Sequence, residues 1–269
     1  MLWRPLRQAL QNPIFCGGLE EFVRQNTRRS HLLNYLIVLS IVLFITWPKE
    51  GFLSLRDLPF TYNAMGGTVL IILAYLHLSQ GARKILGSRY LSVHDWLLLA
   101  PLEAGPFLRG YLAVGLLDVV VFWGVSLPLL VLAAGVSGES LGHLGAGMLI
   151  ILVCAGCYRI IGTALLLLLE RDEFFLYIVV RILYVFIVLV SGFIVPFGNP
   201  ILAFADASVW PRHLGQLGLP GMTLHGWEVT TILHLLLGGL FFIIASIRVR
   251  WVRHRAMVPM AEEGEHGNV

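Results

Sequence analysis

The sequence has few charged residues, few cysteines and none of the common catalytic signatures. Only 13% of its 269 residues are Asp, Glu, Lys or Arg, against about 25% in an average soluble domain. So few charges cannot cover the water-exposed surface of a soluble protein of this size. The three cysteines, Cys16, Cys154 and Cys157, provide no disulfide framework. No G-x-x-x-x-G-K-[ST] phosphate loop, G-x-S-x-G or H-E-x-x-H motif is present, which argues against a nucleotide site in this chain and against common hydrolases.

Long hydrophobic runs take the place of the missing charges, and 57% of the residues are hydrophobic. A helix needs about 20 apolar residues to cross a bilayer core of roughly 30 Å. The runs are continuous and do not alternate every second residue, which favours helices over an outer-membrane barrel. We predict an all-α, polytopic membrane protein with six transmembrane helices. The predicted spans are 32–47, 61–80, 110–134, 143–169, 174–196 and 229–247.

Lysine and arginine are unevenly divided between the predicted loops, and this bias sets the orientation of a membrane protein. Fourteen of them lie in the two terminal segments, the loop at 81–109 and the turn at 170–173, and three lie in the other loops. The three are Lys49, Arg56 and Arg212. We therefore expect both termini and the loop at 81–109 in the cytoplasm of a cell whose inner membrane holds the protein.

The chain divides into a cytoplasmic N-terminus at 1–31, a six-helix domain at 32–247 and a cytoplasmic basic, then acidic, tail at 248–269. Within the first region, residues 17–30 predict a short amphipathic helix on the inner leaflet, with a solvated linker as the alternative. The apolar face of that predicted helix holds Leu19, Phe22, Val23 and Asn26. The segment at 197–228 is too rich in Pro and Gly for a full span, and predicts short re-entrant or interfacial helices near 199–207 and 212–225.

The loop between the second and third spans contains a strongly apolar cytoplasmic segment. Ser92 and Asp95 form a capping-box pattern that begins a short helix, and Pro101 ends it. This helix carries Trp96, Leu97, Leu98 and Leu99. Such a helix must bury its apolar side chains against the membrane, its own bundle or a groove on a soluble partner.

Residues 95–102, Asp-Trp-Leu-Leu-Leu-Ala-Pro-Leu, followed by Phe-Leu-Arg-Gly-Tyr-Leu at 107–112, resemble the cytoplasmic loop of ABC-2 type transporter permeases. The resemblance extends to an N-terminal amphipathic helix, six spans and a long outer segment between the fifth and sixth. Residues 191–196, Ser-Gly-Phe-Ile-Val-Pro, are similar to the end of that family's fifth span. Ala100 stands where the family usually has Thr or Ser, and the segment at 197–228 departs from its pattern.

The resemblance implies that Asp95, Trp96, Leu97, Leu98, Leu99 and Pro101 form a coupling helix that contacts a separate ABC ATPase subunit. This chain would carry no cofactor and no catalysis of its own, since ATP and Mg would bind the ATPase. It would export a substrate together with a second permease chain, as a homodimer or a heterodimer. The bilayer is the remaining partner, and no nucleic acid is expected.

Three ionisable side chains, Asp118, Arg159 and Arg181, lie inside predicted spans, and such residues are costly in a bilayer. At about 1.5 Å per residue, all three lie roughly 10–15 Å from the cytoplasmic ends of their helices. We predict an intramembrane charge network in which Asp118 pairs with Arg159 or Arg181. It would act as a fixed ion pair or line the pathway, and His77 and Gln80 could join it. No metal site is expected, since Cys154 and Cys157 lack further ligands nearby.

Two other functional classes fit the sequence. A membrane scaffold would use the same cytoplasmic loop to recruit a soluble partner, and only the identity of that partner separates it from a permease. An intramembrane enzyme is the weaker alternative, because Glu20-Glu21, the pair that suggests a protease, lies outside every predicted span.

Overall fold

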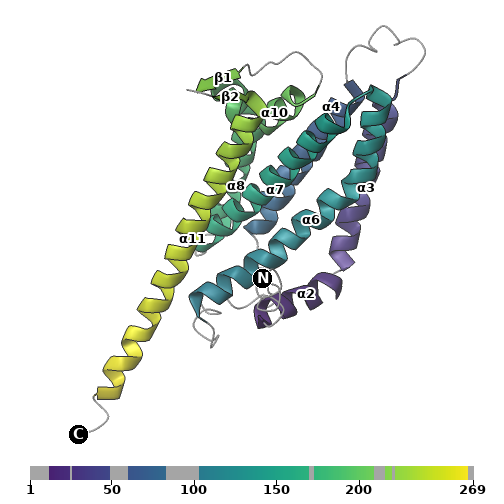
Figure 1. The fold of residues 1–269 in the computed structure, drawn as a ribbon. Helices are drawn as coiled ribbons and strands as arrows, with labels where there is room; N and C mark the ends of the chain where they lie inside the picture. The colour runs from purple at the N-terminus through teal and green to yellow at the C-terminus, as the bar shows by residue number, and fades with distance from the viewer. Residues whose placement is uncertain are drawn as a thin grey trace, which may run out of the picture.

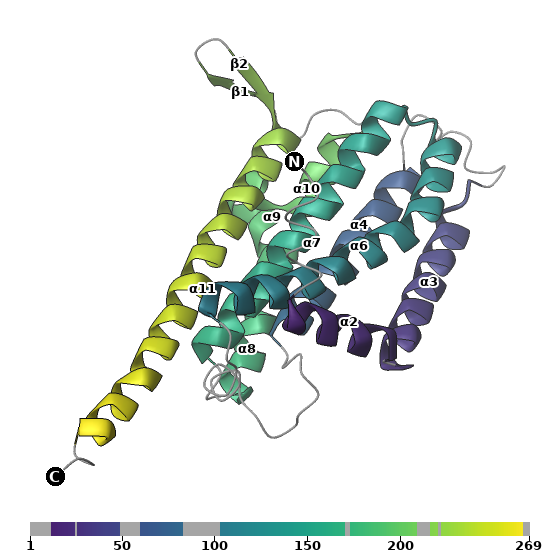
Figure 2. The same ribbon diagram turned by 60° about the horizontal axis from the view of Figure 1, so that its bottom comes forward.

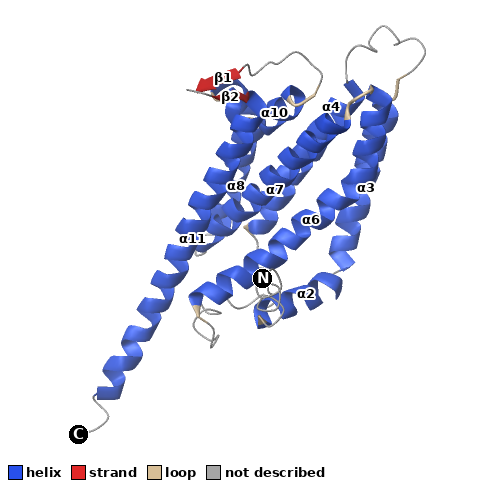
Figure 3. Cartoon of the chain, viewed as in Figure 1, coloured by secondary structure: helices blue, strands red, loops and turns tan. Residues whose placement is uncertain are grey.

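The computed structural model describes residues 12–24, 26–48, 60–82, 103–169, 173–208, 216–219 and 222–265. Within these residues the chain is almost entirely helical, with one short hairpin (Figures 1 and 3). The longer helices are α2 Pro13–Arg24, α3 Asn26–Thr46, α4 Phe60–Gly81, α6 Ala104–Ser137, α7 Leu141–Leu169, α8 Glu173–Val185 and α11 Gly226–Glu265. The shorter elements are a π-helical segment Phe186–Val190, α9 Ser191–Ile194, a 3-10 turn Pro196–Gly198, α10 Pro200–Asp206, β1 Gln216–Leu219 and β2 Met222–His225.

Six helices of the described chain are long and apolar enough to cross a bilayer, which confirms the six predicted spans. They are Arg28–Thr46, Phe60–Gly81, Ala104–Ser137, Leu141–Leu169, Phe174–Ile194 and Gly226–His254. The fifth is not one regular helix, because the π-helical segment joins α8 to α9 inside it. The predicted boundaries are correct to within a few residues at most ends, and the third and sixth spans are longer than predicted.

The six spans run up and down, so their ends fall into two groups. We call the basic end the one formed by α2, the start of α6 and the end of α7. We call the hairpin end the opposite one, which carries β1, β2 and α10 (Figure 1). α11 extends beyond the other helices at the basic end, where the C-terminus lies (Figure 2). It continues unbroken through Glu265, so the predicted domain boundary at 248 does not coincide with a break in the helix.

α2 lies across the basic end, against α6 (Figure 2). The sequence predicts one amphipathic helix over 17–30, whereas the structure has α2 ending at Arg24 and α3 beginning at Asn26. The buried face of α2 also differs from the prediction: Ile14 and Gly18 are buried, while Val23 is 63% exposed. Residues 14 and 18 are one turn apart and share a face, so contact with α6 decides which side of α2 is covered.

α4 and α7 form the centre of the bundle and pack along each other more extensively than any other pair of helices. Their backbones meet at two glycines, Gly81 and Gly162. A Cβ atom at Gly162 would overlap the carbonyl oxygen of Leu78, and one at Gly81 would lie 2.7 Å from the carbonyl oxygen of Arg159. Small residues at such crossings let membrane helices approach closely, so this glycine pair sets the separation of the two central helices.

The sequence instead assigns the close approach of this helix to Gly142, Gly145, Gly147 and Gly156. Of these, only Gly147 leaves too little room for a Cβ atom, because Tyr62 and Phe204 press against it. A Cβ at Gly145 would meet nothing within 4 Å. The prediction is therefore correct at one position and misses the crossing at Gly162.

The segment after α9 contains one helix and one hairpin at the hairpin end. α10 confirms the short helix predicted near 199–207. The helix predicted at 212–225 is wrong, because β1 and β2 pair there as antiparallel strands, with Gln216 opposite His225 and Leu219 opposite Met222. Pro220-Gly221 separates the strands in the sequence, and this dipeptide is a turn signal that also opposes a helix.

Replacement of Gly162 with Ala tests the glycine crossing. Its Cβ overlaps backbone of α4, which cannot rotate away as a side chain can, so we expect a loss of about 1–3 kcal/mol in the free energy of unfolding, typical of overpacking. Thermal denaturation in detergent, followed by size-exclusion fluorescence, measures the shift. Gly145→Ala on the same helix is the matched control and should melt like the wild type. Equal melting of both variants would refute the crossing.

Candidate functional site

The predicted coupling helix lies outside the described residues. This holds for each residue that the resemblance assigns to it, namely Asp95, Trp96, Leu97, Leu98, Leu99 and Pro101. The described chain resumes at Glu103, which precedes the first residue of α6. The candidate site is therefore built from the elements that hold α6 where it leaves this loop, and from the charged side chains further along the same helix.

α2 holds the first turns of α6 through three contacts. The side-chain amide of Asn12 donates a hydrogen bond of 2.7 Å to the carbonyl of Pro106. The same side chain lies so close to Gly110 that a Cβ there would be 2.8 Å from it. One turn further along α6, Val114 lies against Gly18 of α2. The first turns of α6 are thus fixed to the N-terminal segment of the chain.

Asp118 forms an ion pair with Arg28, and the predicted pairing with Arg159 or Arg181 is corrected here. The Arg28 Nε lies 2.9 Å from Asp118 Oδ1, with the carboxylate fully buried and the arginine side chain 16% exposed. Arg28 begins the first span and lies at the basic end, so its long side chain reaches inward along α6. The pair joins α3 to α6 in the half of the bundle near the basic end.

Arg159 lies beside this pair and belongs to the same cluster. It is 4% exposed and its guanidinium donates a 3.2 Å hydrogen bond to Gln80 of α4. The side chain crosses α6 at Gly115, where a Cβ would collide with it, and Gly115 shares a helical face with Asp118. Arg159 and Asp118 attract each other electrostatically. The expectation that Gln80 joins the charged residues is met through this bond to Arg159.

His77 completes the cluster on α4, one turn before Gln80. It is fully buried, with its ring edge-on to Phe122 of α6 at 5.9 Å between centroids. Neither ring nitrogen of His77 has a hydrogen-bond partner among the described residues, and the same is true of Arg159 Nε. Buried polar atoms are nearly always paired in native proteins, so such atoms mark a place where water or a ligand group would be stabilised.

Arg181 stands apart from the cluster. It lies on α8, is exposed, and stacks over the ring of Tyr177 with 4.0 Å between the guanidinium carbon and the ring centroid. A cation–π contact of this kind stabilises a charge at a partly apolar surface. Arg181 therefore has a local partner on its own helix and takes no part in the contacts of Asp118.

The cluster holds two guanidinium groups and one carboxylate in a low-dielectric interior. Taking an ion pair out of water costs several kcal/mol per ion, and mutual attraction offsets this only with good geometry. The arrangement is suited to fastening α3, α4, α6 and α7 to one another and to releasing them when one partner moves. No group of three His, Cys, Asp or Glu able to hold a metal occurs in the described part of the chain.

The contacts of His234 and of the two buried cysteines indicate that these residues pack helices together. Tyr158 and His234 are hydrogen-bonded at 3.0 Å between Oη and Nε2, and the other ring nitrogen of His234 contacts the carbonyl of Thr230 at 2.9 Å. This fixes α7 against α11. Cys154 and Cys157 are buried and free, and a Cβ atom added at Gly238 of α11 would lie 3.7 Å from the Cys157 sulfur.

Asn199 organises the irregular segment between the fifth and sixth spans, and sequence reasoning missed it. Its amide nitrogen donates to the carbonyl of Val188, at 3.2 Å, and to Ser191 Oγ, at 3.0 Å. Its amide oxygen accepts from the backbone N–H of Ile201 and Leu202, at 2.9 and 3.0 Å. One buried side chain thus both caps α10 and satisfies a carbonyl in the π-helical segment. The signal was present as Asn199-Pro200, the pattern of an N-cap followed by proline at the first helical position.

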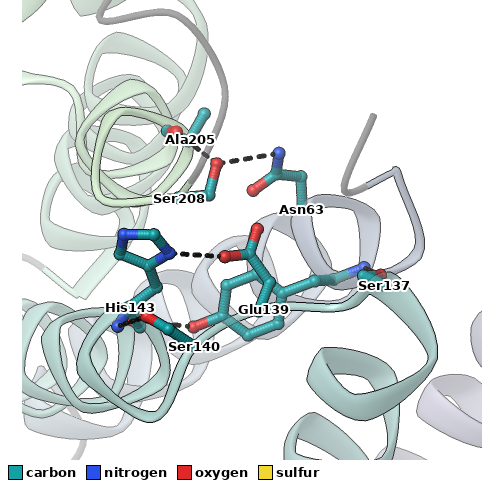
Figure 4. A network of polar contacts seen from close by, with 8 residues as sticks. Asn63, Ser137, Glu139, Ser140, His143, Ala205 and Ser208 are labelled. Atoms are coloured by element: carbon teal, nitrogen blue, oxygen red, sulfur yellow. Dashed lines mark hydrogen bonds and ion pairs between the residues drawn. The ribbon is translucent and has the colours of Figure 1, made fainter. Parts of the chain in front are cut away.

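Further polar contacts tie the hairpin end together (Figure 4). His143 Nδ1 lies 2.8 Å from a carboxylate oxygen of Glu139, whose side chain is fully buried. Asn63 of α4 donates a 3.3 Å hydrogen bond to Ser208, just after α10. The start of α11 is held from the same region, because the N–H of Trp227 donates to the Asp206 carboxylate at 3.1 Å. An acidic group at a helix N-terminus is favourable, so α10 anchors α11.

Comparison with known proteins gives no relative: no family model, no curated protein and no solved structure matches this chain.

A double-mutant cycle tests the Asp118–Arg28 pair. Asp118→Asn leaves the buried arginines without their carboxylate, and breaking a buried pair typically costs about 3–5 kcal/mol of stability. In an Arg28→Met background the same substitution should cost much less, as read from thermal denaturation in detergent. The control cycle uses Arg181→Met, in which the effects should add. If the effects of Asp118→Asn and Arg28→Met on stability simply add, the two residues do not form a stabilising pair.

Asn199→Ala tests the role of the buried amide. Its loss leaves carbonyls of the π-helical segment and N–H groups of α10 unpaired, so we expect faster amide hydrogen exchange across 187–202. Asn63→Ala, which removes a single 3.3 Å bond, is the matched control and should leave exchange there unchanged. Wild-type exchange in Asn199→Ala would show that the segment is held by other contacts.

Proposed function

We propose that this chain is the membrane-spanning permease subunit of an ATP-driven ABC transporter of the ABC-2 type, working as an exporter. The observation that carries the proposal is the resemblance of residues 95–112 to the coupling loop of those permeases. The six-span fold with a helix lying across the basic end supports it. ATP and Mg would bind a separate ATPase subunit.

The contacts of α6 give the proposal a mechanical basis. The ATPase would push on the loop at 92–100, which continues directly into α6. α6 is held at its start by Asn12, just before α2, and by Gly18 of α2, and further along by Arg28 of α3 at Asp118. A movement of α6 along its axis would therefore strain the hydrogen bond and the ion pair together. Packed helix interfaces favour discrete arrangements over continuous deformation, which is what a two-position pathway requires.

The proposed setting is the inner membrane of a cell, with the basic end toward the cytoplasm. The distribution of lysine and arginine supports this orientation, because the residues at the basic end include Arg24, Arg29, Arg109 and Arg250. A second permease chain, identical or homologous, would complete the pathway. Exposed apolar side chains on α3 and α8 provide surfaces for lipid or for that chain, among them Ile41, Phe44, Phe174 and Ile182.

Co-purification tests the proposal. The tagged full-length chain is extracted in mild detergent, and its companions are identified by mass spectrometry. We expect an ABC ATPase subunit with the wild type and at least a tenfold loss of it with Trp96→Asp/Leu98→Asp, because carboxylates would oppose an apolar groove contact.

Leu141→Asp is the matched control, since Leu141 is an 86% exposed apolar residue at the hairpin end, and it should retain the ATPase. Both variants must elute as the wild type does in size exclusion. Recovery of a soluble partner that is not an ATPase would replace the permease by a membrane scaffold. Recovery of no partner from several mild detergents would count against both.

A further inference from the structure

The last part of α11 combines an apolar stripe with a group of arginines. Exposed apolar side chains follow one another at helical spacing, namely Leu236, Leu240, Ile243 and Ile247. The next exposed position in this stripe is Trp251, at 44%. Positions i, i+3, i+4 and i+7 lie on one helical face, so the lipid-facing stripe of the span leads without a break to Trp251.

Basic side chains begin where this stripe ends. Arg248, Arg250, Arg253 and His254 all lie within three residues of Trp251, and no acidic residue occurs in α11 between Glu228 and Glu262. Val249 and Val252 are buried, so the helix still packs on the bundle here. Arg250 and His254 are exposed on the side away from these valines. The basic group is thus held on a fixed part of the helix.

Arg248 is held in position by two contacts. Its Nε donates a 3.2 Å hydrogen bond to the carbonyl of Leu167, in the last turn of α7. Its guanidinium carbon lies 4.5 Å from the centre of the Trp251 ring. The last carbonyls of a helix have no partner within it, so this bond places Arg248 at the level where the α7 span ends. A second arginine, Arg253, has a buried Nη1 with no hydrogen-bond partner in the described part of the chain.

We propose that Arg250, Trp251 and Arg253 form a binding site for an anionic phospholipid. The lipid phosphate would lie between the guanidinium groups of Arg250 and Arg253, which are three residues apart on one helical face and are the best matched side chains for phosphate. Its acyl chains would run along the stripe from Ile247 toward Leu236. Trp251 lies between the two parts, at the depth where tryptophan is favoured in membranes.

The continuity of the apolar stripe and the basic group distinguishes a lipid from other anionic partners. Nucleic acid or an acidic protein surface would use the arginines and leave Ile243 and Ile247 uncovered. A phospholipid matches both parts, and basic groups next to a span attract anionic headgroups. The site needs no ATPase subunit and does not depend on the proposed function.

Native mass spectrometry of lipid retention tests the site on the purified full-length chain. The probes are phosphatidylglycerol and phosphatidylcholine with identical acyl chains, added at equal concentration in detergent. We expect the wild type to retain phosphatidylglycerol at least fivefold over phosphatidylcholine. Arg250→Gln/Arg253→Gln should reduce this preference to less than twofold, because the phosphate would lose both guanidinium groups of the site.

The matched control is Arg29→Gln/Arg109→Gln, which removes two exposed arginines from the basic end at other helices. It should keep the wild-type preference, and an equal loss would overturn the site in favour of diffuse attraction. Arg250→Gln alone, at an exposed position, covers the case in which the double variant does not fold, and should lower the preference at least twofold. No preference in the wild type, or retention of nucleic acid or an acidic protein in place of lipid, would also overturn the proposal.

Discussion

A carboxylate in the interior of a membrane-spanning bundle must have a cation beside it, and the position of Asp118 shapes its surroundings accordingly. The carboxylate is fully buried and lies 2.9 Å from Arg28 Nε. Arg28 lies in the first turn of α3, so the pair fixes how far α3 reaches down along α6. Arg159 adds a second positive group on α7 and is in turn bonded to Gln80 of α4. Four spans are thus positioned by groups that would be unstable apart.

The absence of water from a bilayer interior also constrains the backbone at the hairpin end. Inside hydrocarbon every N–H and C=O must find a partner within the protein, and the π-helical segment and the start of α10 leave several without one. Asn199 supplies donors and acceptors at the right places. A short helix can then fold back into the bundle, where Phe204 presses against Gly66 and Gly147. A single polar side chain makes an irregular chain path tolerable at this depth.

The spans could be predicted because their length is dictated by the bilayer, and a run of apolar residues carries that constraint directly. Contacts between spans carry no such signal. Asp118 was identified as a charge needing a partner, yet three arginines could reach it, and Arg28 was assigned to a separate surface helix because the break after Arg24 leaves no sequence mark. The glycine crossing at Gly162 was missed for a similar reason, since many glycines in α7 are alike in sequence and only the neighbouring helix distinguishes them. The hairpin at 216–225 was predicted as helix although Pro220-Gly221 opposed it.

The contacts described here converge on α6. Asn12, just before α2, is bonded to the first turn of α6, Arg28 of α3 is paired with Asp118, and Arg159 of α7 crosses α6 at Gly115. The N-terminal segment of the chain contributes two of these three restraints. Asn12 precedes every span, and Arg28 is the first residue of the first span. A helix restrained at several points along one side cannot slide freely, so it moves only if those restraints break or move with it. A displacement of α6 would therefore have to break these contacts or carry α2 and the start of α3 with it.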